Sequence, residues 1–247
     1  MTISPIFDKL QDQIPQLQSY VASLGIVLPG KIDQELFLQT FIHKSFAADY
    51  KDSEFHNERL EFVGDGILGA SINKLLFLDN PHMPESNLTL YKIALVREEI
   101  LAEVARDILL NEKLFISKGE EKTQGRKKDS ILSDGLEALI GFVYIQCGAS
   151  SAEDFIKTHI YSKKEGLQET NIKSYKTKIQ ELIQKQHKII PEYKDLEDKI
   201  DEKGNVIQYR TEIYINQIKQ SEGIGTNKKK AQEDAAKNYY QQIQSSL

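Results

Sequence analysis

Three carboxylates recur at helical spacing in the first third of the chain. Glu58, Glu61 and Asp65 stand at positions i, i+3 and i+7 within residues 57–69, which read NERLEFVGDGILG. On a helix, side chains at these positions fall within about 60° of one another, so the three acids share one stripe. Like charges repel and burial raises carboxylate pKa values, which makes such a cluster costly unless a cation binds it.

A second acidic pair lies about seventy residues downstream. Asp134 and Glu137 stand at i and i+3 within residues 131–144, ILSDGLEALIGFVY, and the rest of this segment is largely apolar. Sites made of carboxylate oxygens favour hard cations such as Mg²⁺, with Mn²⁺ as a plausible substitute. In phosphodiester hydrolysis such ions activate water and offset charge on phosphate oxygens, so no histidine base is required.

The alternative for these acids is a solvated helix surface, which is the usual interpretation of a lone i, i+3 pair. Two acidic stripes embedded in apolar helices favour a metal site instead. The five histidines are dispersed without the spacing of metal ligands, and we expect them to be structural or on the surface. The stretch 222–229, EGIGTNKK, lacks the spacing of a phosphate-binding P-loop.

Composition indicates a globular protein with two differently charged regions. The chain has 247 residues and a net charge of −5, but residues 171–247 carry +3 and residues 1–170 carry −8. An acidic body that holds cations and a basic region that binds a polyanion would explain this split, although chance is an open alternative. Cys147 is the single cysteine, no apolar run reaches 18 residues, and the N-terminus has no secretory pattern. We therefore expect a cytoplasmic protein without a membrane partner.

The elements that position these residues fall into two groups. Residues 1–160 show helical periodicity and predict an all-α domain, with Pro81 and Pro84 in a loop between two helices and a basic-ended loop at 118–130. Residues 161–172 are polar and predict a linker. Residues 173–245 predict a small α+β domain in the order α-β-β-β-α, with strands at 192–200, 207–215 and 217–223.

Several segments together resemble the ribonuclease III family. NERLEFVGD at 57–65 looks like its signature, and residues 131–144 resemble its second acidic motif. FIHKSF at 41–46 and the segments LVREEILAEVARDILL and KGEEKTQGR also match the family pattern. The similarity extends over nearly the whole chain and includes a C-terminal double-stranded-RNA-binding domain.

The resemblance implies a role for each matching residue. Glu61, Asp65, Asp134 and Glu137 match the family's metal-binding carboxylates, and Asp65 and Glu137 match the two most directly tied to hydrolysis. Glu58 matches an acid beside the site, and Phe62 matches an aromatic that contacts the partner subunit, with plain core packing as the alternative. Glu85 aligns with an acid of substrate handling, although Ser86 follows it where the family usually has glycine.

The resemblance also implies the reaction. We expect a homodimer that hydrolyses both strands of double-stranded RNA with a divalent metal, needs no small-molecule cofactor, and leaves 5′-phosphate and 3′-hydroxyl ends with short 3′ overhangs. A role in processing rRNA and mRNA precursors follows from the same likeness.

The C-terminal domain carries its own candidate contacts. Thr177, Gln180 and Glu181 share one face of the first predicted helix, where short polar side chains reach 2′-hydroxyls in the shallow A-form groove. Lys228 and Lys229 follow Asn227, a predicted N-cap, and match phosphate-contacting lysines. The loop 201–208, DEKGNVIQ, departs from the family by lacking its proline and histidine, which predicts a weaker or remodelled contact.

Two other functions stay open at this point. A double-stranded-RNA-binding protein without activity would use the same scaffold, but the presence of all four acids disfavours it. An all-helical nucleotide pyrophosphohydrolase also holds Mg²⁺ on acidic helices, but it would not need the C-terminal α-β-β-β-α unit.

Overall fold

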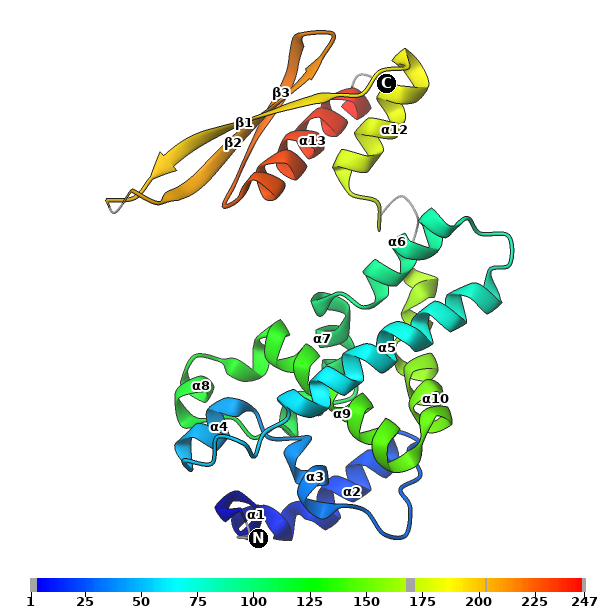
Figure 1. Ribbon diagram of the computed structural model, residues 1–247, viewed down its shortest axis with the longest axis vertical. Coiled ribbons are helices and arrows are strands. Elements are labelled where there is room, and N and C mark those ends of the chain that lie inside the picture. Colours follow the sequence, from blue (N-terminus) through cyan, green and yellow to red (C-terminus); the bar gives the residue numbers. More distant parts are fainter. Residues whose placement is uncertain (1–3, 168–171, 203, 246–247) are drawn as a thin grey trace. The chain divides into compact units, whose positions relative to one another are not determined.

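The computed structural model describes residues 4–167, 172–202 and 204–245. The chain divides into two compact units, Met1–Gln168 and Glu169–Leu247, and each is described by itself. Figure 1 labels the elements.

The first unit is helical throughout its described part, apart from one isolated bridge between Ile42 and Phe115. Its helices are α1 (Pro5–Leu10), η1 (Gln11–Gln13), α2 (Ile14–Ser23), α3 (Gln34–Gln39), α4 (Lys44–Asp49), α5 (Glu58–Asp79), α6 (Glu85–Leu95), α7 (Glu98–Asp107), η2 (Leu110–Glu112), α8 (Lys118–Lys122), η3 (Gly125–Lys127), α9 (Asp129–Cys147), α10 (Ala149–His159) and η4 (Tyr161–Gly166).

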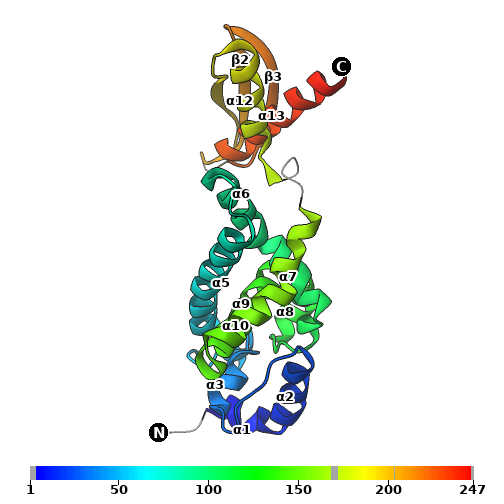
Figure 2. The same cartoon turned by 90° about the vertical axis from the view of Figure 1, so that its right-hand side faces the viewer.

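Helix α9 is the centre of this unit. It packs against α5, α7 and α10, and Figure 2 shows α5, α9 and α10 as neighbours. Leu132, Leu136, Leu139 and Phe142 of α9 are fully buried in a single continuous hydrophobic core. By length and composition α9 is apolar enough to cross a membrane, but most of it is buried inside the unit. Its apolar character is therefore that of a core helix, and this makes Asp134 and Glu137 in its interior more unusual.

The second unit is a three-stranded antiparallel sheet with two helices. It contains α12 (Tyr175–His187), β1 (Glu192–Ile200), β2 (Val206–Ile215), β3 (Ile218–Gly225) and α13 (Lys228–Ser245), with the strands in the order β1-β2-β3. The expected α-β-β-β-α order is confirmed. The alternation expected of a strand is present in β2, where Thr211, Ile213 and Ile215 are buried and the residues between them are not.

Close backbone contact fixes α13 on the sheet. A Cβ atom added to Gly223 would lie 2.1 Å from the amide nitrogen of Ala235, so only glycine fits at this point of β3. The small residues Ala231, Ala235 and Ala236 provide the matching face of α13, and Ile179 and Ile183 of α12 complete the core. Figure 1 shows α12 and α13 side by side next to the sheet.

Two segments differ from the sequence expectation. The expected linker at 161–172 begins with the 3-10 helix η4, because Tyr161 is buried and donates a 3.3 Å hydrogen bond to the carbonyl of Leu75. Residues 168–171 lie outside the described residues. The expected loop at 118–130 contains α8, η3 and the start of α9, and Ser117 caps α8 by accepting a hydrogen bond from the amide of Glu120.

Candidate active site

Helices α5 and α9 touch through their backbones. A Cβ atom on Gly64 would lie 1.8 Å from the carbonyl oxygen of Glu137, and one on Gly141 would lie 2.1 Å from the carbonyl oxygen of Leu60. Both distances are far below any real contact of a Cβ atom, so glycine is required on each helix. The crossing places Glu61 of α5 beside Glu137 of α9.

Three of the four predicted metal-binding acids meet at this crossing. Glu61, Asp134 and Glu137 each offer a carboxylate oxygen, and these oxygens lie within 4.8 Å of one another. All three residues are half-buried. The two acidic segments that are far apart in sequence therefore form one cluster, as their placement on apolar helices suggested.

The cluster is under electrostatic stress. Burial, followed by the charges of Asp65, Glu61 and Asp134, raises the pKa of Glu137 to about 8. Burial is also the largest cause that raises the pKa of Glu61 and that of Asp134. Within the described ranges, no ion pair reaches Glu61, Asp134 or Glu137. The repulsion between these carboxylates is relieved when one of them takes up a proton or when a cation binds between them.

Asp65 and Glu58 lie at the margin of this cluster. Asp65 is exposed one turn beyond Glu61 on α5 and is not among the three grouped acids, although its charge acts on Glu137. Glu58, at the first position of α5, accepts a 2.8 Å hydrogen bond from Lys44, which lowers the pKa of Glu58. The structure thus brings together Glu61, Asp134 and Glu137, and leaves Asp65 and Glu58 on the rim.

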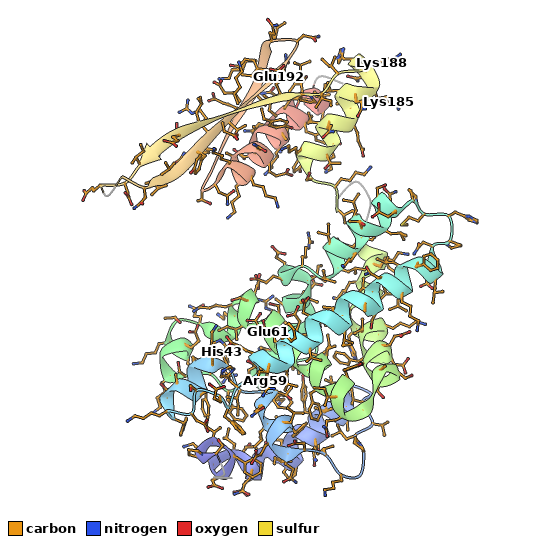
Figure 3. All side chains as sticks on the ribbon, in the orientation of Figure 1. His43, Arg59, Glu61, Lys185, Lys188 and Glu192 are labelled. Atoms are coloured by element: carbon orange, nitrogen blue, oxygen red, sulfur yellow. The ribbon has the colours of Figure 1, made fainter. Side chains whose placement is uncertain are left out.

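Lys44 is a neighbour that the sequence did not single out. Its pKa is raised first by the hydrogen bond to Glu58 and further by the charges of Asp134 and Glu61. The preceding His43 caps α4, since its Nδ1 accepts a 3.2 Å hydrogen bond from the amide of Ser45. Figure 3 labels His43 and Glu61 near the N-terminal end of α5. The only signal for Lys44 was its place in the family-like stretch at 41–46.

Two further predicted residues lie outside the acidic cluster. Phe62 lies outside the core and is 80% exposed on α5, which excludes the alternative that it packs in the core of this chain. Glu85 begins α6 and accepts a 2.9 Å hydrogen bond from the hydroxyl of Thr89. It lines a shallow pocket with Asn73 and Phe77 instead of joining the three acids.

The second unit presents two separate polar groups. On α12, Gln180 and Glu181 are exposed and Thr177 is half-buried, and the carboxylate of Glu181 already pairs with Lys173 at 3.0 Å. At the start of α13, Asn227 Oδ1 accepts a 2.9 Å hydrogen bond from the amide of Lys230, which confirms the predicted N-cap.

The lysines that follow Asn227 and the β1–β2 turn carry the remaining candidate contacts of this unit. Lys228 and Lys229 are exposed, and Lys228 Nζ lies 5.9 Å from the ring centre of Tyr209. The β1–β2 turn is closed by Asp201, whose carboxylate accepts a 2.8 Å hydrogen bond from the amide of Asn205, and Gly204 has a φ of 85°.

Comparisons with known proteins match both units. The family described as Ribonuclease-III-like matches residues 33–164, and the double-stranded RNA binding motif matches residues 175–243. The second match accounts for the C-terminal α-β-β-β-α unit, which the alternative of a pyrophosphohydrolase leaves unexplained.

Two relatives match this chain over most of their own length. Ribonuclease 3 of Natranaerobius thermophilus is 34% identical over 212 residues, which span 86% of this chain and 91% of the relative. Ribonuclease 3 of Staphylococcus aureus is 35% identical over 212 residues, which span 85% of this chain and 86% of the relative.

A solved structure agrees with the fold of the first unit. The nuclease domain of ribonuclease III from Campylobacter jejuni, a structure with flexibility in a region involved in dimer formation, has a TM-score of 0.53 and 32% identity. The alignment covers 59% of this chain and 96% of that domain. With its paired acidic helices and its RNA-binding unit, this chain belongs to the ribonuclease III family of double-stranded-RNA endonucleases.

Proposed function

We propose that Glu61, Asp134 and Glu137, together with Asp65 on the rim, hold divalent metal for the hydrolysis of duplex RNA. Mg²⁺ is the metal we assign, with Mn²⁺ as a substitute. The observation that carries this proposal is the grouping of three half-buried carboxylates with oxygens within 4.8 Å of one another. Among the described residues, none forms an ion pair with any of these three acids.

The donor set fits such a metal. Mg²⁺ binds oxygen at about 2.0–2.1 Å, so oxygens on opposite sides of one ion are about 4 Å apart. The three carboxylates approach this spacing and offer only hard oxygen donors. When bound, the metal supplies an acidified water and positive charge next to the phosphate.

The protein's own residues perform the remaining tasks. Glu137 and Asp65 are the two acids we place nearest to the reacting phosphate, as the likeness to the family implies. Glu137 is half-buried at the crossing and Asp65 is exposed to solvent. Glu58 stays at the edge, where Lys44 holds its carboxylate. Attack by water gives 5′-phosphate and 3′-hydroxyl ends, and end-labelled products identify these groups directly.

Glu137→Gln is the experiment that tests the metal site. The substitution keeps the shape of the side chain but removes the charge that a cation needs, so cutting with Mg²⁺ is expected to fall by at least a hundredfold while duplex binding survives. Glu99→Gln, on the exposed first turn of α7, is the matched control and should cut normally. Normal cutting by the Glu137→Gln protein would remove Glu137 from the site.

We propose that the enzyme works as a homodimer through the outer face of α5. Phe62 is 80% exposed there, and aromatic residues are enriched at protein interfaces. Phe62→Asp should weaken dimerisation by about tenfold or more, because the apolar ring no longer leaves water. Sedimentation over a range of concentrations measures this, and an unchanged dimer would contradict the assignment.

We assign duplex binding to the second unit, with Thr177 and Gln180 of α12 toward the minor groove and Lys228 and Lys229 of α13 toward phosphates. Glu181 belongs to the same face, where its carboxylate pairs with Lys173 and can still accept a further hydrogen bond. Glu85, on α6, keeps a subsidiary role in substrate handling, which an increased KM of Glu85→Ala would reveal.

We place catalysis in residues 1–160 and RNA binding in residues 173–245, with residues 161–172 as the linker between them. Processing of rRNA and mRNA precursors in the cytoplasm is the cellular role that fits a duplex-specific nuclease with one cysteine. Cells that lack the protein are expected to accumulate uncut precursors. In cells that contain it, the protein is expected in the cytoplasmic fraction. Recovery in the membrane fraction would contradict the location.

A further inference from the structure

A carboxylate of α13 caps the other helix of the second unit. Glu233 Oε1 accepts a 2.5 Å hydrogen bond from the amide of Tyr175, and its Oε2 accepts one of 3.2 Å from the amide of Lys176. Ser174 Oγ accepts a third from the amide of Thr177 at 3.1 Å. The first turn of α12 is thus bound largely by a residue 57 or 58 positions away.

The neighbouring Gln232 extends this contact into the sheet. Its Oε1 accepts a 2.6 Å hydrogen bond from Lys176 Nζ, and its Nε2 donates to the carboxylate of Asp195 on β1 at 2.9 Å and 3.2 Å. Asp195 also accepts a 2.7 Å hydrogen bond from the hydroxyl of Thr211 on β2. A polar network therefore joins α12, α13, β1 and β2.

The network distinguishes the two helix N-termini. A helix N-terminus attracts anions through its free amides and its dipole. At α12, the charge of Glu233 already occupies this position, so a phosphate there would be repelled. At α13, Asn227 binds the amide of Lys230, and the exposed Lys228 and Lys229 flank the turn. Only the α13 end is suited to phosphate, which leaves α12 to contact RNA through its side chains.

We propose that Gln232 and Glu233 are positioning residues for duplex binding. They fix the polar face of α12, with Thr177 and Gln180, relative to the Lys228–Lys229 end of α13. An A-form duplex presents its minor groove and the adjacent phosphates at a set spacing, so a shift of α12 loses one of the two contacts. This inference rests on the proposed assignment of these RNA contacts.

The sign of the effect separates positioning from simple electrostatics. Removal of a negative charge from an RNA-binding unit by itself strengthens binding to a polyanion. Glu233→Ala is nevertheless expected to weaken binding of a blunt RNA duplex by the full chain by about three- to tenfold. Binding is measured without added divalent metal, so that the RNA stays intact.

Asp234→Ala is the matched control. It removes the same charge from the next residue, whose carboxylate accepts a 2.9 Å hydrogen bond from the amide of Ile224 on β3 instead of from α12. This variant should bind the duplex as tightly as the parent or more tightly. Weaker binding of both variants to the same extent would overturn the proposal, because the loss would then be general to α13.

A double-mutant cycle tests whether Glu233 acts through α12. Thr177→Ala with Gln180→Ala removes the α12 contacts. Adding Glu233→Ala to this double variant should then lower duplex affinity by less than about 1.5-fold. Multiplied losses would show that Glu233 does not act through these contacts. If the Thr177 and Gln180 substitutions alone leave affinity unchanged, the RNA-contact assignment fails, which is a different result from failure of the positioning role.

A milder substitution keeps the test valid if Glu233→Ala destabilises the unit. Glu233→Gln keeps one side-chain oxygen as an acceptor for a backbone amide, and its folding is checked by its unfolding temperature. It should bind the duplex more weakly than the parent, less so than Glu233→Ala, and show the same coupling to Thr177 and Gln180. Binding as tight as that of the Asp234 control would contradict the proposal.

Discussion

At the scale of single residues, Glu137 connects burial, charge and pH. Its pKa is about 8, compared with an ordinary value of 4.5. Between these two pH values, Glu137 is therefore protonated in the folded protein and ionised in the unfolded chain. The stability linked to this proton is fully present below pH 4.5 and is lost as the pH rises through 8. A divalent cation at the site we propose would replace this proton, so proton and metal would compete for the same carboxylates.

This competition gives a pH prediction. In the absence of divalent metal, the unfolding temperature should fall from pH 5 to pH 8, and Mg²⁺ should raise it more at pH 8 than at pH 5. Thermal melts in both conditions measure the effect, and Glu137→Gln isolates it because the amide does not titrate. If the variant retained the same dependence on pH and Mg²⁺, other groups would be responsible.

At the scale of elements, the sequence predicted each acidic stripe because side-chain position on a helix follows from spacing alone. It also predicted the strands of the second unit, because their inner residues alternate, as in Thr211, Ile213 and Ile215. The meeting of the two stripes was proposed from chemistry. Its cause, the close contact at Gly64 and Gly141, is a pairing between residues 77 positions apart that leaves no local pattern.

Other features also depended on tertiary contacts. The exposure of Asp65 is set by how α5 crosses α9, and helix periodicity does not specify that rotation. Helix α8 is five residues long and rich in charge, and its cap at Ser117 gives only a short local signal. Glu233 of α13 caps α12, and these are the first and last helices of the second unit. Because the contacting residues are so far apart in sequence, no spacing rule indicates the contact.

The helix crossing yields a prediction with an internal control. Gly64→Ala places a methyl group against the carbonyl of Glu137, so α5 must move away from α9 at a cost of about 3 kcal/mol. We expect a lower unfolding temperature and at least a tenfold loss of metal-dependent cutting. Gly66→Ala, where nothing lies within 4 Å, should instead raise stability by about 1 kcal/mol through helix propensity. Equal effects of both variants would argue against a tight crossing.

At the scale of the whole molecule, charge is divided between the two tasks. Residues 1–170 carry a net −8, which suits a region that holds cations, and residues 171–247 carry +3. A net charge this low predicts moderate duplex affinity that depends on a few well-placed lysines. Specificity for duplex shape then comes from the spacing of α12 and α13 instead of from a broad basic surface.

The lysines at the start of α13 test this division of tasks. Lys228→Ala with Lys229→Ala removes two phosphate contacts, so the slope of log affinity against log salt should become shallower by about 2. Affinity should fall alike for all duplex sequences, because phosphates carry no sequence information. The rate of cutting at saturating RNA should remain near that of the parent, since the acidic cluster belongs to the other unit.

A double variant on the sheet controls for the loss of charge. Lys194→Ala with Lys219→Ala removes the same two charges from β1 and β3, where these lysines contact Tyr214 and Glu212. Its salt slope should stay unchanged if only the α13 lysines touch phosphates. A loss confined to particular RNA sequences in the Lys228 and Lys229 variant would instead mean that these side chains contact bases, and the anion site at the start of α13 would have to be abandoned.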